Sequence, residues 1–212
     1  MGDLQTRFGR ILGNAGLVTE GQLRRPGTED VVAYKDADQI LDVYRELGGI
    51  QQAPSIRPGA WDLEWEGIAV ELDEQLHFNR YRALTLRSPL YRRLKSFPTV
   101  EYVAYCETYE SECVAAGSYG KKWSNSSCEV QFGIAGEHWN LTGRGAPRWR
   151  QRAFYDFVKD LSPLLIGVPM ARIAVWDELQ ESIGVRTVAD AIRNPATKTV
   201  DVLVALVRQR AT

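Results

Sequence analysis

The most regular alternation of hydrophobic and polar residues lies between residues 61 and 73. Hydrophobic side chains occupy every second position on both sides of the pair Glu66-Gly67, namely Trp61, Leu63, Trp65, Ile68, Val70 and Leu72. Such alternation around an X-Gly pair predicts a β-hairpin, because glycine adopts the positive φ that a tight two-residue turn needs. A turn at Glu66-Gly67 would place Trp65 opposite Ile68 and Asp62 opposite Glu71.

The other face of the predicted hairpin is acidic. It carries Asp62, Glu64, Glu71 and Asp73. Like charges directly opposite each other destabilise a sheet, and carboxylate oxygens at this density suit a divalent cation such as Mg²⁺ or Mn²⁺. The alternative is an ordinary solvated outer face. That alternative explains Glu64 better than Glu71 and Asp73, which lie within and just after the apolar run 68–72.

The remaining elements follow from helical or strand-like spacing. Hydrophobic residues recur at helical intervals in 4–12, 36–47, 100–116, 147–161, 187–192 and 199–208, and residues 171–176 (ARIAVW) predict a strand of the same sheet. Residues 103–106 are also compatible with a strand. We therefore expect one α/β domain over 1–212, with a mixed sheet built on the hairpin and flanked by helices. Residues 1–30 would be peripheral, 36–176 the core and 187–210 C-terminal helices.

Composition narrows the class of protein. The chain has 212 residues, 44% of them hydrophobic, which is ample for one sizeable core. It has no apolar run of membrane-spanning length and no signal-peptide pattern, and its three cysteines argue against a secreted disulfide framework. These features predict a cytoplasmic protein without a membrane partner.

Positive charge is local. The net charge is −1, yet residues 78–95 contain no acidic residue and six cations: Arg80, Arg82, Arg87, Arg92, Arg93 and Lys95. A basic run directly after an acidic hairpin fits a substrate with a phosphate backbone, although a solvated basic face is the alternative. Further cations that we expect to contact DNA are Lys121 and Lys122, in a loop, and Arg148, Arg150 and Arg152, in the helix 147–161.

The hairpin resembles the core of the PD-(D/E)XK nuclease superfamily, most closely the branch related to very-short-patch-repair endonucleases. The resemblance rests on Asp62, the short hairpin, Glu71-Leu72-Asp73 and His77. It implies a restriction-endonuclease-like fold in which Asp62 and Glu71 bind the metal and His77 is an acid–base or phosphate contact. Asp73 stands where the family has a lysine. Lys121 or Lys122, in the loop named above, would supply the lysine that is missing at position 73.

A second motif supports the same resemblance. Gln151 and Tyr155 lie four residues apart in the predicted helix 147–161 and are therefore adjacent in space. This Q-x3-Y spacing resembles a helix motif of RecB-like nucleases in the same superfamily. The resemblance implies that Gln151 and Tyr155 lie beside the metal site and contact DNA.

The cysteines allow a different metal site. Cys106, Cys113, Cys128 and His138 make up a complete tetrahedral zinc set, although they lack the close C-x2-C spacing of common zinc modules. The alternative is three buried free thiols, which pack as small hydrophobic groups.

We therefore expect a metal-dependent DNA endonuclease, acting in restriction, repair or phage defence, alone, as a homodimer or within a larger complex. Its catalytic residues would be Asp62, Glu71, Asp73 and His77, with Mg²⁺ or Mn²⁺ held by the three carboxylates. Two rivals are a catalytically inactive nucleic-acid-binding protein on a degenerate nuclease core and a zinc-stabilised interaction module.

Overall fold

The sheet at the centre of the computed structural model has four strands in the order β1-β2-β3-β4. The model describes residues 2–118, 122–181 and 184–211. The strands are β1 (Val18–Thr19), β2 (Leu63–Trp65), β3 (Ile68–Asp73) and β4 (Met170–Ala174). β2 is antiparallel to both β1 and β3, and β4 runs parallel to β3. The predicted mixed sheet is therefore confirmed at this level.

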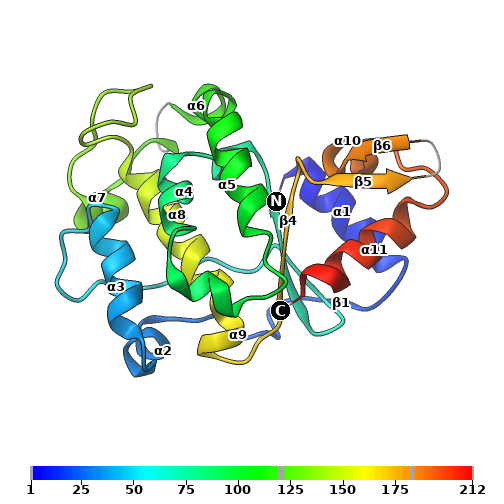
Figure 1. Ribbon diagram of the computed structural model, residues 1–212, viewed down its shortest axis with the longest axis horizontal. Helices are drawn as coiled ribbons and strands as arrows, with labels where there is room; N and C mark the ends of the chain where they lie inside the picture. The colour runs from blue at the N-terminus through cyan, green and yellow to red at the C-terminus, as the bar shows by residue number, and fades with distance from the viewer. Residues whose placement is uncertain (1, 119–121, 182–183, 212) are drawn as a thin grey trace.

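Helices cover both faces of this sheet (Figure 1). On one side lie α2 (Thr28–Ala33), α3 (Ala37–Glu46), α4 (Arg80–Thr85), α5 (Thr99–Thr108), α6 (Glu110–Gly117), α7 (Ser126–Phe132), α8 (Pro147–Asp160) and α9 (Ser162–Leu165). On the other side lie α1 (Asp3–Gly13), α10 (Val188–Arg193), α11 (Thr199–Arg210) and a small hairpin of β5 (Glu178–Glu181) and β6 (Gly184–Thr187). Two short 3₁₀ helices, η1 (Gln75–His77) and η2 (Pro89–Arg93), flank α4. In the described residues, no helix is both long and apolar enough to span a bilayer.

The predicted hairpin is present with the predicted register. Trp65 pairs with Ile68 and Leu63 with Val70. Glu66 and Gly67 form the turn with φ values of 50° and 77°, both in the region that a tight primed turn needs. The indole nitrogen of Trp65 donates to the carbonyl of Leu12 in α1, so the apolar face of the hairpin packs on the N-terminal helix.

The N-terminal segment is part of the core. We expected residues 1–30 to be peripheral, but Leu4, Phe8, Ile11 and Leu12 of α1 are buried in the main hydrophobic cluster. This cluster also contains Leu203, Val204 and Val207 of α11. Because α1 and α11 cover one face of the sheet together, the stripe on α11 is a core face.

Two other expectations need correction. The predicted helix over 100–116 is interrupted at Tyr109, where α5 ends and α6 begins. Tyr109 has φ −108° and ψ 17°, and its ring stacks on Trp176 with a centroid distance of 3.9 Å. Trp61 does not share the face of Leu63, because β2 begins only at Leu63. It packs instead with Ala69 and Met170.

Candidate functional site

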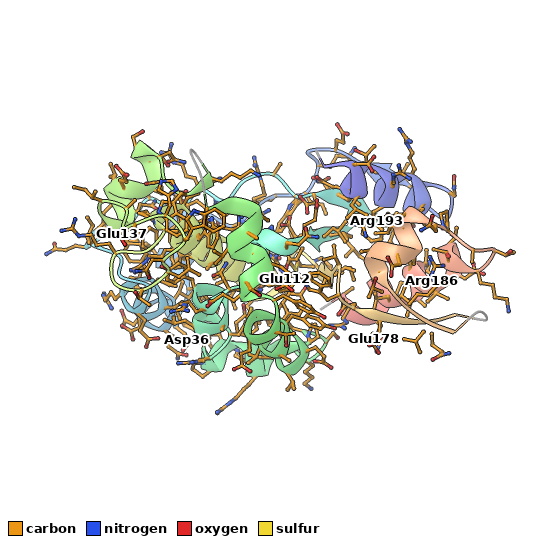
Figure 2. All side chains as sticks on the ribbon, turned by 90° about the horizontal axis from the view of Figure 1, so that it is seen from above. Asp36, Glu112, Glu137, Glu178, Arg186 and Arg193 are labelled. Carbon is orange, nitrogen blue, oxygen red and sulfur yellow. The ribbon has the colours of Figure 1, made fainter. Side chains whose placement is uncertain are left out.

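The acidic face of the hairpin is buried. Helix α8 covers Glu71, and residues 19–23 cover Glu64. Glu64, Glu71 and Asp73 are 4%, 3% and 0% exposed, so they are not part of a solvated outer face. By contrast, the surface carries other acidic groups, such as Glu112 and Glu137, which are exposed (Figure 2). Burying carboxylates is costly unless they are paired or hydrogen-bonded. The partners of these buried acids therefore define the site.

Asp62 and Glu71 lie side by side across the hairpin, as the register predicted. The backbone N–H of Asp62 donates to Oε1 of Glu71 at 3.1 Å, and the backbone N–H of Leu72 donates to Oδ2 of Asp62 at 3.0 Å. The side chain of Gln5 from α1 donates to Oδ1 of Asp62 at 2.9 Å. The pair of carboxylates is therefore held by backbone and by α1.

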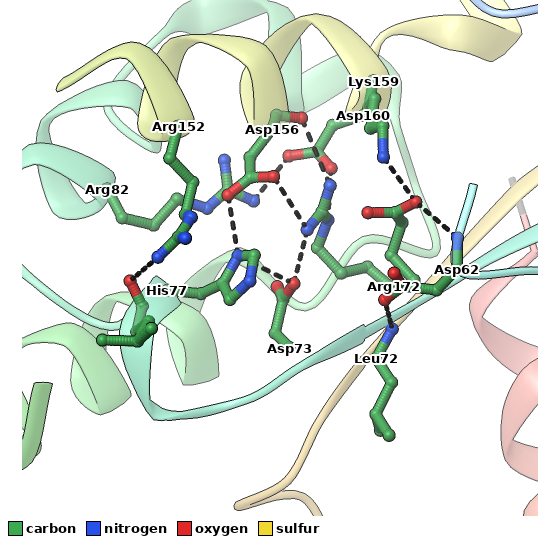
Figure 3. A network of polar contacts seen from close by, with 12 residues as sticks. Asp62, Leu72, Asp73, His77, Arg82, Arg152, Asp156, Lys159, Asp160 and Arg172 are labelled. Carbon is green, nitrogen blue, oxygen red and sulfur yellow. Dashed lines mark hydrogen bonds and ion pairs between the residues drawn. The ribbon is translucent and has the colours of Figure 1, made fainter. Parts of the chain in front are cut away.

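Lys159 of α8 contacts the Glu71 member of this pair (Figure 3). Its Nζ lies 2.7 Å from Oε1 of Glu71 and donates to the carbonyl oxygen of Ala60 at 2.8 Å. The same ammonium lies 5.2 Å from the centre of the Trp61 ring. Lysine is thus present next to Asp62 and Glu71, although it comes from a helix 88 residues beyond Glu71 in the chain.

The loop lysines that we expected in this role lie elsewhere. Lys122 donates to the carbonyl of Ala116. Lys121 lies outside the described residues. No local sequence pattern singles out Lys159, because charged residues of an amphipathic helix usually face solvent.

Burial changes the protonation of the carboxylate pair. Desolvation raises the pKa of Glu71 to about 7, although the charge of Lys159 opposes this rise. Desolvation also raises the pKa of Asp62, opposed by the N–H of Leu72 and by Lys159. Both acids therefore accept protons more readily than exposed carboxylates do.

Glu71 should make the stability of the protein pH-dependent. Its folded-state pKa of about 7 lies above the ordinary 4.5, so the stabilising protonated form is lost as pH rises through this interval. Between about pH 4.5 and 7 the free energy of unfolding of the wild-type protein should therefore fall by roughly 3 kcal/mol. We expect this fall to be absent in Glu71→Gln, because glutamine does not titrate. Urea unfolding of both proteins across this range measures the difference, and parallel pH curves would contradict the assignment.

Asp73 faces a second, larger group of buried charges (Figure 3). Arg172 of β4 donates to Asp73 at 2.6 Å and to Asp160 of α8 at 2.6 Å. Arg82 of α4 reaches the other oxygen of Asp160 at 2.6 Å. Arg172, Asp160 and Arg82 are each no more than 2% exposed, so the network joins α4, α8 and the strands β3 and β4 inside the core.

His77 closes this network at its other end. Its Nδ1 lies 2.9 Å from Asp156 and 3.2 Å from Asp73. Burial opposes the charge of His77, but these two carboxylates outweigh it and raise its pKa. His77 is therefore held by Asp73 and Asp156 on the side of the sheet that faces α8.

Two of the three predicted metal ligands lie together in the site. Among the described residues, no group of three or more His, Cys, Asp or Glu side chains is arranged to hold a metal. Asp73, predicted as a third ligand, is paired with Arg172 and His77 instead. Asp62 and Glu71 remain as two adjacent carboxylates, and Mg²⁺ commonly uses one or two carboxylates together with waters and substrate phosphate oxygens.

The four residues predicted to bind zinc do not form a site in the described part of the chain. The three cysteines are free and buried. The polar contacts of these residues are local instead. Sγ of Cys113 accepts a hydrogen bond from the side chain of Asn79, and Sγ of Cys128 donates one to the carbonyl of Asn125. Nδ1 of His138 lies 2.6 Å from the carbonyl of Ser118. The break between α5 and α6 also removes the continuous helical face that was to align Cys106 with Cys113.

These thiols should resist modification in the folded protein. Burial raises the pKa of Cys106 to about 12 and that of Cys113 to about 11, and the thiolate is the reactive form. We expect Ellman's reagent to titrate these two residues at pH 8 only after denaturation. Rapid reaction of either thiol in the native protein would contradict their burial.

Several of the predicted DNA-binding cations have partners within the protein. Arg80 pairs with Glu110, Arg150 donates to the carbonyls of Leu47 and Gly143, and Arg152 donates to the carbonyl of Leu76. Arg82 is 1% exposed and paired with Asp160, so it is not available to a phosphate. The basic run 78–95 is therefore not one continuous cationic surface.

Gln151 and Tyr155 do lie together, in a groove of about 490 Å³ that we call the α8 groove. Gln151 donates to Oε1 of Gln131, and the amide of Gln131 donates to the hydroxyl of Tyr155. The lining also includes Arg57 and Arg148, and none of its residues in the described part of the chain is acidic. Tyr155 lies one helical turn before Lys159, so the groove and the carboxylate pair both contact α8.

The fold and site thus define a mixed α/β protein with a carboxylate pair and a lysine beneath a central helix. A family model described as a family of unknown function (DUF7255) matches residues 42–194, more than half of the chain. The chain belongs to this family. Neither the curated proteins nor the solved structures include a match to it.

Proposed function

We propose that the protein is a metal-dependent nuclease that hydrolyses phosphodiester bonds, with Asp62, Glu71 and Lys159 as its catalytic residues. The observation that carries the proposal is the contact between Lys159 and Glu71, 2.7 Å long and immediately beside Asp62. The PD-(D/E)XK resemblance requires two carboxylates and a lysine, and Lys159 supplies from α8 the lysine that is missing at position 73.

The arrangement of elements supports a restriction-endonuclease-like fold as part of this proposal. The antiparallel hairpin β2–β3 carries both acids, and β4 is added in parallel next to β3. Helices cover both faces of the sheet (Figure 1). The contact between Lys159 and Glu71 places α8 on the face that carries Glu71.

Asp62 and Glu71 would hold the metal. Their oxygens are the hard ligands that Mg²⁺ and Mn²⁺ prefer. When bound, such an ion supplies a water of lowered pKa and positive charge next to the phosphate. The raised pKa values of Glu71 and Asp62 mean that metal binding competes with protons, so activity should increase as pH rises through about 7.

Lys159 would hold the attacking water and the phosphate. Its ammonium has three donors, of which Glu71 and Ala60 accept two. A third donor is thus left for an oxygen of substrate or water beside Asp62. The α8 groove is lined by Arg57 and Arg148 and has no acid in its described lining. Its arginines would bind the phosphates of the nucleic-acid backbone.

The test is cleavage of supercoiled plasmid DNA by the purified protein. We expect nicking with Mg²⁺ or Mn²⁺ and none with EDTA. RNA of matched length, tested alongside, decides which nucleic acid is the substrate. If neither is cleaved with either metal over a range of pH, the nuclease proposal fails.

One observation favours the second candidate, an inactive nucleic-acid-binding protein. Lys159 and Glu71 are 6% and 3% exposed, and their opposite charges form an ion pair with each other without a metal or a substrate. The α8 groove would then be the functional surface. Binding of DNA without cleavage under all metal conditions identifies this case.

A further inference from the structure

A second and larger hollow, of about 830 Å³, opens beside Asp62. We call it the Asp62 cavity. Residues 60–64 form one wall and residues 18–25 the other. Gly59 lines the α8 groove and its neighbour in the chain, Ala60, lines the Asp62 cavity, just before the hairpin begins.

The Asp62 cavity has a different chemistry from the α8 groove. Its lining carries three acids against two arginines, together with apolar side chains: Glu20, Asp62, Glu64, Arg24, Arg25, Val18, Leu23, Trp61 and Leu63. Carboxylates repel a phosphate but accept hydrogen bonds from neutral N–H groups. An uncharged ring with N–H donors therefore suits this cavity better than a phosphate does.

Glu64 offers such an acceptor. Its side chain is 4% exposed, and its Oε2 accepts the backbone N–H groups of Gln22 at 2.9 Å and Leu23 at 3.1 Å. These bonds hold the wall 18–25 in place. The hydrogen bonds that Glu64 accepts from described residues all go to Oε2, which leaves Oε1, on the wall of the cavity, as an acceptor for a ligand.

The catalytic groups are recessed rather than displayed on an open surface. Glu71 is 3% and Lys159 is 6% exposed, whereas Asp62 lines the cavity. The backbone of an intact duplex is too stiff to enter a hollow of this kind, but an unpaired nucleotide can leave the stack and enter a pocket. With the base of such a nucleotide in the cavity, its phosphate would lie near Asp62, and the metal that Asp62 and Glu71 would hold would offset the repulsion by these carboxylates.

We propose that the Asp62 cavity receives the base of one unpaired nucleotide, and that the enzyme acts on single strands or unpaired ends rather than on intact duplexes. This inference rests on the proposed nuclease function and names its substrate. In it, the α8 groove binds the phosphates of the same strand. Arg25 lies in the cavity lining, is exposed and has no ion-pair partner among the described residues, so it would contact the sugar-phosphate of the inserted nucleotide.

The experiment compares binding of three labelled DNA probes by fluorescence anisotropy in EDTA: a single strand, the same strand in a blunt duplex, and a duplex with an unpaired tail. We expect the single strand and the tailed duplex to bind about 10-fold more tightly than the blunt duplex. Arg25→Ala should weaken binding of these two probes about 5-fold, and Arg10→Ala, at an exposed arginine of α1 outside both hollows, should not.

A second variant tests the base contact. Glu64→Gln presents an amide to the cavity, and we expect it to remove a preference for oligo-dC over oligo-dT, because only cytosine has an exocyclic amino donor. Thermal unfolding shows whether this variant keeps its fold. If it does not, the Arg25 comparison decides. Equal binding of blunt duplex and single strand, or no effect of Arg25→Ala, overturns the cavity proposal and leaves the nuclease proposal standing if plasmid DNA is nicked.

Discussion

Replacing Lys159 by methionine is expected to reduce metal-dependent DNA cleavage by roughly 10²- to 10⁴-fold, the range lost when a positioned proton-transfer group is removed. Methionine keeps the unbranched shape of the buried stem but donates no hydrogen bond. Glu71 loses its partner at 2.7 Å, and the raised pKa of this acid allows it to become neutral rather than to remain as a buried charge. We therefore expect the variant to fold.

Initial rates of plasmid nicking at saturating Mn²⁺ measure this effect. The matched control is Lys35→Met, which makes the same change at an exposed lysine outside both hollows and should cleave at the wild-type rate. Glu71→Gln should also abolish cleavage while retaining or tightening DNA binding, because it removes a negative charge that faces the phosphate. Normal cleavage by either Lys159→Met or Glu71→Gln would show that the chemistry lies elsewhere.

Replacing Arg172 by methionine is expected to lower the free energy of unfolding by about 3–5 kcal/mol. The guanidinium is 1% exposed and pairs with Asp73 and Asp160 at 2.6 Å each. Its removal leaves these two carboxylates buried next to each other with less positive charge between them. Urea unfolding at pH 7 measures the loss.

An exposed ion pair provides the comparison. Arg93 pairs with Asp36 at 2.7 Å but is 38% exposed, so Arg93→Met should cost no more than about 1 kcal/mol. Adding Asp73→Asn to Arg172→Met should recover part of the loss, because it removes one of the stranded charges. A cost near that of Arg93→Met would show that the interior network contributes little to stability.

Local sequence patterns predicted the hairpin and its register correctly. Alternation and the Glu66-Gly67 turn are properties of adjacent residues, so they placed Asp62 opposite Glu71. The same reasoning put Trp61 on the wrong face, because alternation does not show where a strand begins. It also continued one helix through Tyr109, where the stacking partner is Trp176, 67 positions further along the chain.

The partners of the acids could not be predicted in this way. Lys159 and Asp160 occupy ordinary positions of an amphipathic helix, and Arg172 lies in a short apolar strand. Each is distinctive only because the parallel pairing of β3 and β4 brings its segment against the hairpin. A resemblance motif that covers the hairpin alone cannot contain this information.

The parallel pairing of β3 with β4 also governs how the chain can fold during synthesis. Asp73 and Arg172 are 99 residues apart, so the hairpin leaves the ribosome long before the strand that completes it. Contacts between such distant segments form slowly, and an incomplete chain exposes an unpaired strand edge. Nascent chains that end before β4 should therefore remain unfolded or bound to chaperones, and resistance to protease should require β4 together with α11, whose buried residues complete the core.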